Sequence, residues 1–133
     1  MTVLKDGEPV FTYTDKQKVP GPVTKIPIPN MAIGDTVKIA IKGGYLSLAE
    51  VKVFGSAVKD QEWTDVARGD KATQSSTGWN GPASRAVDGN TDGRYGKRSV
   101  THTRKEENPW WQVDLGKDHF IKAIKVFNRK EIP

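Results

Sequence analysis

The feature that most limits what this chain can fold into is its frequent interruption by glycine and proline. Thirteen glycines and eight prolines are spread over 133 residues, and the apolar runs between them are short, without a long helical period. Residues 37–42 alternate apolar and cationic side chains, which is typical of a strand with one buried face. The pattern predicts an all-β protein, most economically a β-sandwich or jelly roll.

Further candidate strands are residues 10–14, 110–115 and 121–127, which are rich in β-branched and aromatic side chains. Four prolines fall between residues 19 and 30, and proline has no backbone N–H to donate to a neighbouring strand. We therefore do not expect residues 19–30 to form a central strand.

One predicted strand, residues 45–55, changes its hydrophobic phase. Leu46 and Leu48 share one face by parity, whereas Val51 and Val53 share the opposite face. Such a change of face requires a bulge or a kink at the alanine and glutamate that lie between these two pairs. A bulge would turn a backbone carbonyl away from the hydrogen bonds of the sheet, and the glutamate carboxylate would lie beside it. The alternative, which spacing alone favours, is a central strand buried on both faces.

Length and cysteine content narrow the classes of protein further. The length predicts one domain over residues 1–133, and the lack of cysteine excludes disulfides, a thiolate nucleophile and cysteine-ligated zinc. No apolar run approaches the roughly 18 residues of a membrane helix, and the first residues show no signal-peptide core. The latter leaves the location of the protein open.

A loop at residues 86–93 gathers Asp88, Asn90 and Asp92 at alternate positions around two glycines. Oxygen ligands of these types suit a hard cation such as calcium. An ordinary turn explains the same residues equally well, because Asp-Gly and Asn-Thr-Asp-Gly are common turn sequences.

The net charge of +5 is concentrated in residues 94–105, which hold five cations, no acid and His102. Guanidinium groups offer paired donors to hydroxyls, sulfates, carboxylates and phosphates. A nucleic-acid protein would show a stronger basic stripe with interleaved aromatic residues. Neither a Ser-His-Asp order nor a paired-carboxylate pattern is present, so we expect a protein that is not an enzyme and does not bind nucleic acid.

Several segments resemble the first half of the F-type lectin (fucolectin) family, within the discoidin, or coagulation-factor type C, superfamily. They are residues 71–77, 83–92, 99–103, 108–116 and 126–129. Residues 45–55 resemble the end of the same domain. The resemblance implies a discoidin-like jelly roll in which Trp110 and Trp111 lie largely in the core.

The order of these halves is reversed relative to the family. Residues 1–57 resemble its C-terminal half and residues 63–133 its N-terminal half, which implies a circular permutant. A fragment of a tandem array that pairs by domain swapping is the alternative. We expect the permutant, as a monomer, because the termini of compact domains often lie close together.

The resemblance also implies a sugar site. His102 and Arg129, 27 positions apart, match the spacing of the family's histidine and first arginine, and Glu131 stands where an aspartate is usual. The family's second cation would fall beyond the chain, and Lys5 has no motif match. Donation of hydrogen bonds from His102 and Arg129 to sugar hydroxyls is expected, and Trp79 is the exposed tryptophan that could stack on a sugar.

A structural calcium site is implied as well. Its ligands would be four side chains and two backbone carbonyls: the side chains of Asp88, Asn90, Ser99 and Glu50, and the carbonyls of Arg85 and Ala49. This set also accounts for the change of phase after Leu48.

The first functional hypothesis is thus a non-catalytic, secreted or extracellular lectin-like module that binds fucosylated or sulfated glycans. The second is a discoidin-type interaction domain that binds protein or anionic phospholipid through Trp79, Arg94, Lys97 and Arg98. A third is an excised or re-engineered domain with a vestigial sugar site.

Overall fold

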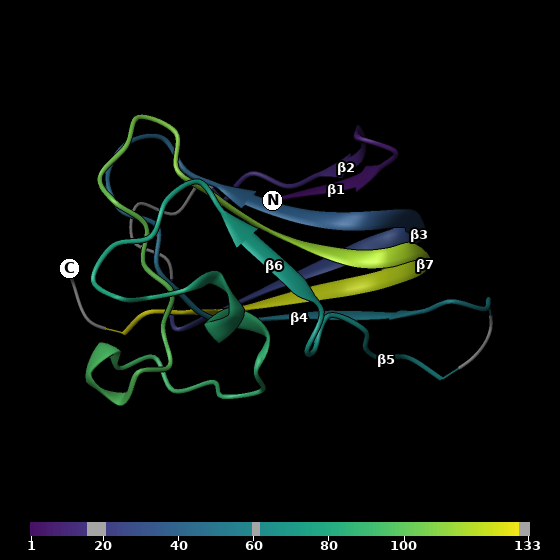
Figure 1. The fold of residues 1–133 in the computed structure, drawn as a ribbon. Coiled ribbons are helices and arrows are strands. Elements are labelled where there is room, and N and C mark those ends of the chain that lie inside the picture. The colour runs from purple at the N-terminus through teal and green to yellow at the C-terminus, as the bar shows by residue number, and fades with distance from the viewer. Residues whose placement is uncertain (16–20, 60–61, 131–133) are drawn as a thin grey trace.

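The computed structural model describes residues 1–15, 21–59 and 62–130. Its strands are β1 (Thr2–Lys5), β2 (Glu8–Thr12), β3 (Val23–Ala40), β4 (Leu48–Ser56), β5 (Thr64–Asp65), β6 (Lys71–Gln74) and β7 (Trp110–Asn128). Two short 3-10 helices, η1 (Ala83–Val87) and η2 (Tyr95–Lys97), are the only helices in the described ranges. Neither has the length or apolarity that crossing a membrane requires. The predicted all-β class is confirmed (Figure 1).

The strands form one antiparallel sheet in the order β2-β1-β3-β7-β4-β5, with β6 also on β7. The two long strands, β3 and β7, each contribute to both layers into which this sheet folds. Residues 36–40 of β3 pair with residues 110–114 of β7, beside β1 and β6, whereas residues 23–27 pair with residues 123–127, beside β4. Because both strands bend between these stretches, the sheet folds over a shared core, consistent with a discoidin-like β-sandwich (Figure 1).

The bend depends on glycine. The register of β3 on β7 breaks between Gly34 and Thr36, and a Cβ on Gly34 would lie 2.6 Å from Cγ1 of Val3. In β7 the corresponding bend contains Gly116, whose φ of +86° is in the left-handed region that favours glycine. A side chain at position 34 would therefore prevent β1 from packing against the bend.

The core lies between the layers. Ile26, Val53 and Ile124 form a buried row across β3, β4 and β7, because Ile124 is the register partner of both others. Trp111 is fully buried and its indole N–H donates to the carbonyl of Ala83, 3.0 Å away. Of the tryptophan pair expected in the core, Trp111 is a core residue. Trp110 is only half-buried, with Nζ of Lys38 5.2 Å from its ring centroid.

The proline-rich stretch illustrates how a strand accommodates missing donors. Residues 23–27 belong to β3 yet pair only with β7, so they lie at the edge of their layer and not at its centre, as the prolines predict. The separate strands expected at residues 110–115 and 121–127 are instead parts of the single strand β7. Strands β1, β5 and β6 were not predicted from the sequence, since each has four residues or fewer.

The bulge predicted from the hydrophobic phase is confirmed. Leu48 pairs with Asn128 and Glu50 with Phe127, so Ala49 is the extra residue of β4 at this point. The strand is also buried on both faces here, because Leu48, Ala49, Glu50 and Val51 are all at most 2% exposed. Both interpretations of the sequence pattern therefore hold together.

Candidate functional site

His102 lies in an extended segment that hydrogen-bonds to the chain at the start of β4. The N–H groups of Thr101 and Thr103 donate to the carbonyls of Leu48 and Leu46, at 2.8 and 3.0 Å. In return, the threonine hydroxyls accept the N–H groups of Leu48 and Leu46, each at 2.9 Å. Side-chain hydroxyls thus complete a ladder on one side of His102, and all three residues of the segment are buried.

A glycine loop holds the other side of the same segment. The N–H of Gly78 donates to the carbonyl of His102 at 2.8 Å, and the N–H of His102 donates to the carbonyl of Gly81 at 2.9 Å. A Cβ on Gly81 would lie 2.6 Å from the backbone nitrogen of His102, so only glycine allows this approach. The loop between the glycines carries Trp79, which explains how the tryptophan comes to lie beside His102.

The imidazole of His102 has a defined tautomer. Nδ1 lies 2.6 Å from the carbonyl oxygen of Thr103, and because a carbonyl only accepts, Nδ1 carries the hydrogen. Burial lowers the pKa of His102, the charge of Arg129 lowers it further, and the bond to Thr103 opposes them. The ring is therefore neutral at pH 7 and Nε2 is a hydrogen-bond acceptor. In this state Nε2 can accept a hydrogen bond, whereas the sequence led us to expect that His102 donates one to a sugar hydroxyl; the role of His102 toward a sugar stays a prediction.

Three aromatic rings surround His102. Their centroids lie 5.2 Å (Tyr45), 5.7 Å (Tyr95) and 6.4 Å (Trp79) from that of the imidazole. Trp79 is 74% exposed, which agrees with its expected position at the surface. Such a cluster offers both apolar ring surface and a nitrogen acceptor to a ligand.

Arg129 reaches the same cluster from the end of β7. Its guanidinium carbon is 4.8 Å from the ring centroid of Tyr95, and its buried Nε has no hydrogen-bond partner within the described ranges. The N–H of Lys130 donates to the carbonyl of Gly93 at 2.9 Å, which fixes this segment beside η2. The structure thus brings His102 and Arg129 together around Tyr95. Glu131 lies outside the described residues.

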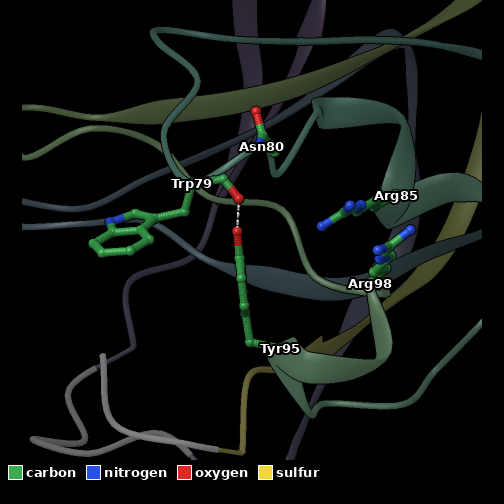
Figure 2. Close-up of a pocket in the computed structure, with 5 residues that line it drawn as sticks. All are labelled: Trp79, Asn80, Arg85, Tyr95 and Arg98. Atoms are coloured by element: carbon green, nitrogen blue, oxygen red, sulfur yellow. Dashed lines mark hydrogen bonds between the residues drawn. The ribbon is translucent and has the colours of Figure 1, made fainter.

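A hollow of about 380 Å³ adjoins this cluster (Figure 2). It is lined by Trp79, Asn80, Arg85, Tyr95 and Arg98. The hydroxyl of Tyr95 donates to the backbone carbonyl of Trp79, and Figure 2 shows the tyrosine ring between the indole and the two guanidinium groups. Tyr95 therefore contributes to both the His102 cluster and the hollow.

The loop after η1 is organised by bonds between near neighbours. Oδ1 of Asp88 accepts the N–H of Asn90, Oδ1 of Asn90 accepts that of Asp92, and Oδ1 of Asp92 accepts that of Arg94, at 2.9–3.0 Å. The guanidinium of Arg94 also pairs with Asp92 at 2.9 Å, and its hydrogen bonds lower the pKa of that carboxyl to about 2. The expected turn chemistry is present in this loop.

Glu50 reaches this loop from the bulge of β4. Its Oε2 accepts the N–H of Gly89 at 2.8 Å, while the buried Oε1 has no hydrogen-bond partner within the described part of the chain. Burial raises the pKa of Glu50 to about 8; the N–H of Gly89 opposes this rise and the charge of Asp88 adds to it. An unpaired oxygen on a buried carboxyl is costly, so this position suits an added cation or proton.

The remaining residues of the expected cation site lie along the same elements. Arg85 is in η1, three residues before Asp88, and Ala49 is the bulged residue beside Glu50. Oγ of buried Ser99 donates to the carbonyl of Asp92 and, at 3.3 Å, to that of Arg94. Among the described residues, no three His, Cys, Asp or Glu side chains gather in a group that could hold a metal.

The residues of the phospholipid hypothesis are dispersed among different roles. Trp79 and Arg98 line the hollow, Arg94 pairs with Asp92, and Lys97 is exposed in η2. Nζ of Lys5 lies 3.5 Å from Oδ2 of Asp118, in the bend region of β7. Lys5 is therefore not among the described groups that contact His102.

Sequence reasoning missed Tyr45 and Tyr95 as ring partners of His102. It also gave Arg85 only a backbone role, whereas its side chain lines the hollow with that of Arg98. The available signal was the pair Gly78 and Gly81, whose spacing of three residues marks a tight loop that lets a second segment pack closely.

Comparison with known proteins identifies relatives of parts of the chain. Residues 85–132 match the sequence model of a family described as NedA-like, galactose-binding domain. A fucolectin of Anguilla anguilla is 40% identical over 70 residues, which are 49% of this chain and 44% of the relative. Fucolectin-5 of Anguilla japonica is 39% identical over 70 residues, which are 49% of this chain and 37% of the relative. Fucolectin-6 of the same organism is 45% identical over 47 residues, which are 35% of this chain and 25% of the relative.

These alignments cover less than half of each relative's own length. No solved structure gives a significant match. The proteins found by sequence are named as lectins, in agreement with the expectation that this chain is not an enzyme. Over the matched segments, the chain is therefore similar to fucolectins and to galactose-binding domains of the coagulation-factor type C kind.

Proposed function

We propose that the chain is an extracellular carbohydrate-binding module that takes a fucosylated glycan at the cluster of His102, Tyr95 and Arg129. The observation that carries the proposal is the His102 imidazole, held by Nδ1 on the Thr103 carbonyl, with three aromatic rings around it and the guanidinium of Arg129 on the ring of Tyr95. Nε2 accepts one sugar hydroxyl, Arg129 donates to another, and a ring covers the apolar face of the sugar. The fucolectin names of the relatives support fucose as the sugar.

Calorimetric titration with a neutral fucosylated oligosaccharide tests this site. We expect His102→Ala and Arg129→Gln each to weaken binding at least tenfold, because each removes a hydrogen bond or leaves its partner unpaired. Lys97→Gln, in exposed η2, is the control and keeps the affinity of the parent chain. Equal affinity of the two site variants and the control overturns the assignment. Thermal melts of each variant check that it is folded, because His102 is buried.

We also propose a structural calcium site built from Glu50, Asp88, Asn90 and Ser99, with the carbonyls of Ala49 and Arg85. The unpaired Oε1 of Glu50, at a bulge beside an Asp/Asn loop, supports it, since the oxygen donors of this set suit calcium. The bound ion would join β4 to the loop that leads to η2. It therefore stabilises the elements that carry Tyr95 and Arg98.

Thermal unfolding with calcium and with EDTA tests this site. Calcium at a hundred times its dissociation constant adds about 2.7 kcal/mol to the free energy of unfolding. We expect a higher melting temperature with calcium, and no such difference in Glu50→Gln. An unchanged melting temperature of the parent chain in calcium overturns the proposal.

We further propose that the domain is a jelly roll with circularly permuted halves and is monomeric. Strand β7, from the second half, lies between β3 and β4 of the first half within one chain. The junction between the halves joins β4 to β5, which are hydrogen-bonded neighbours through Phe54–Asp65 and Gly55–Thr64. Light scattering after size exclusion tests the association state. A mass of 14.7 kDa supports the monomer, and a stable dimer supports the swapped alternative.

A further inference from the structure

The hollow beside the sugar cluster carries two positive charges and no negative one. Of its lining residues, Arg85 and Arg98 are cationic and none of the described ones is acidic. Arg85 donates from Nη1 to the carbonyl of Val100 at 3.2 Å, which leaves further N–H donors of this group available. Arg98 is exposed, and no ion pair within the described ranges includes it. Two guanidinium groups on one cavity suit an oxyanion, because the anion removes their repulsion and accepts paired donors.

The backbone around this hollow is unusual. Trp79, Asn80 and Arg98 have φ values of 50°, 55° and 55°, in the left-handed region that non-glycine residues rarely adopt. They are half of the six non-glycine residues with positive φ in the described chain. Conformations of this kind concentrate at binding sites, where other contacts maintain them. Here the backbone N–H of Arg98 donates to the carbonyl of Tyr95 at 2.9 Å, which holds Arg98 at the end of η2.

The hollow shares a wall with the proposed sugar site. Tyr95 lines the hollow, and its ring centroid lies 5.7 Å from that of His102. The guanidinium carbon of Arg129 lies 4.8 Å from the same Tyr95 centroid. Figure 2 shows both guanidinium groups on the side of Tyr95 away from the indole of Trp79. Tyr95 therefore adjoins both the ring of His102 and the hollow, so a substituent on a sugar bound at His102 would lie near the hollow. Its volume of about 380 Å³ is in the range of small-ligand sites.

We propose that Arg85 and Arg98 form a subsite for an oxyanion, a sulfate ester or a carboxylate, carried by the glycan that binds at His102. The subsite rests on the proposed function for the identity of its carrier, but its affinity for an anion depends on the two arginines alone. The chain would then bind charged glycans selectively, with the neutral sugar on one side of Tyr95 and the anionic group of the glycan on the other.

The test compares three glycans that share one fucosylated core: neutral, sulfated and sialylated. In 50 mM salt we expect the parent chain to bind at least one charged form about tenfold more tightly than the neutral form. The two charged glycans distinguish sulfate from carboxylate. In Arg98→Gln this preference falls to about twofold, while the affinity for the neutral glycan is unchanged. Lys97→Gln removes the same charge outside the hollow and retains the preference.

A second measurement separates this proposal from the sugar site. Sodium sulfate is titrated while the Arg side-chain Nε–H signals are followed by NMR. Shifts at Arg85 and Arg98 in the parent chain, with the shift at Arg85 lost in Arg98→Glu, support the subsite even if the neutral glycan fails to bind. Failure of the neutral glycan to bind would overturn the proposed function alone. No shift with sulfate, together with equal affinity for neutral and charged glycans, overturns the subsite. A preference that persists in Arg98→Glu also overturns it.

Discussion

The segment that carries His102 and the loop from Asp88 to Arg94 lie close to one another but are held in opposite ways. His102 is fixed by bonds from residues more than 20 positions away in sequence, at Leu46, Leu48, Gly78 and Gly81. The Asp88 loop is organised by bonds that each join a residue to the one two positions on. Long-range bonds make His102 part of the folded core, whereas the local turns leave the loop dependent on its contact with Glu50.

The largest effect is expected from Gly81→Ala, which disrupts the long-range contacts that hold the His102 segment. The new Cβ would lie 2.6 Å from the nitrogen of His102, so the Trp79 loop must move away. We expect a loss of about 2–3 kcal/mol in the free energy of unfolding and weaker glycan binding. Urea denaturation measures the former. Gly96→Ala, where no atom lies within 4 Å, is the matched control and leaves stability nearly unchanged.

A smaller effect on the same segment is expected from Thr101→Val. The substitution preserves shape but removes the hydroxyl that accepts the N–H of Leu48, in a fully buried position. An unsatisfied buried N–H costs about 1–3 kcal/mol, which denaturant unfolding resolves. Thr73→Val, at an exposed position of β6, is the control. Equal stability of the two variants would show that the hydroxyl ladder does not hold His102.

Acidification sharpens the role of the ring itself. The pKa of His102 is lowered, so the neutral form with Nε2 as acceptor is fully present at pH 7.5 and is lost only as the pH falls through that lowered pKa. We expect glycan affinity to fall as the pH drops through that lowered pKa, by up to about tenfold for each pH unit below it. Titration calorimetry at several pH values measures it, and tighter binding in acid would show that His102 donates.

The smallest effect is expected from Asp92→Asn, which tests the local bonds that organise the loop from Asp88 to Arg94. The change weakens an exposed pair with Arg94 but retains an oxygen for the turn. We expect a change in melting temperature smaller than that of Thr101→Val, and smaller still at high salt because the pair is screened. Melting at 50 mM and 500 mM salt measures it. A larger effect of Asp92→Asn would reverse the comparison between the two regions.

The sequence predicted features that depend on local pattern. The all-β class followed from alternation. The change of phase after Leu48 indicated either a bulge or a strand buried on both faces, and β4 has both features. The meeting of His102 with Arg129 followed from a resemblance in spacing and is present around Tyr95.

Features that depend on distant contacts were not predictable. Gly34 and Gly116 resemble turn residues, yet they allow the bends within β3 and β7, so the true strands are longer than the expected ones. Tyr45 approaches His102 from 57 positions earlier in the chain, which no local pattern encodes. Arg85 and Arg98 line one hollow only because η1 and the end of η2 fold toward the same tyrosine.

The position of β7 has a consequence for how the chain acquires its fold. Strand β7 separates β3 from β4 in the sheet, yet it is the last strand of the described chain to leave the ribosome. Until residues 110–128 are synthesised, β3 and β4 have no strand between them, and the only strand pairings available in the described chain are those of β1 with β2 and β3 and of β4 with β5. Most of the core must therefore assemble after synthesis of β7, through contacts of high sequence separation that make folding slow.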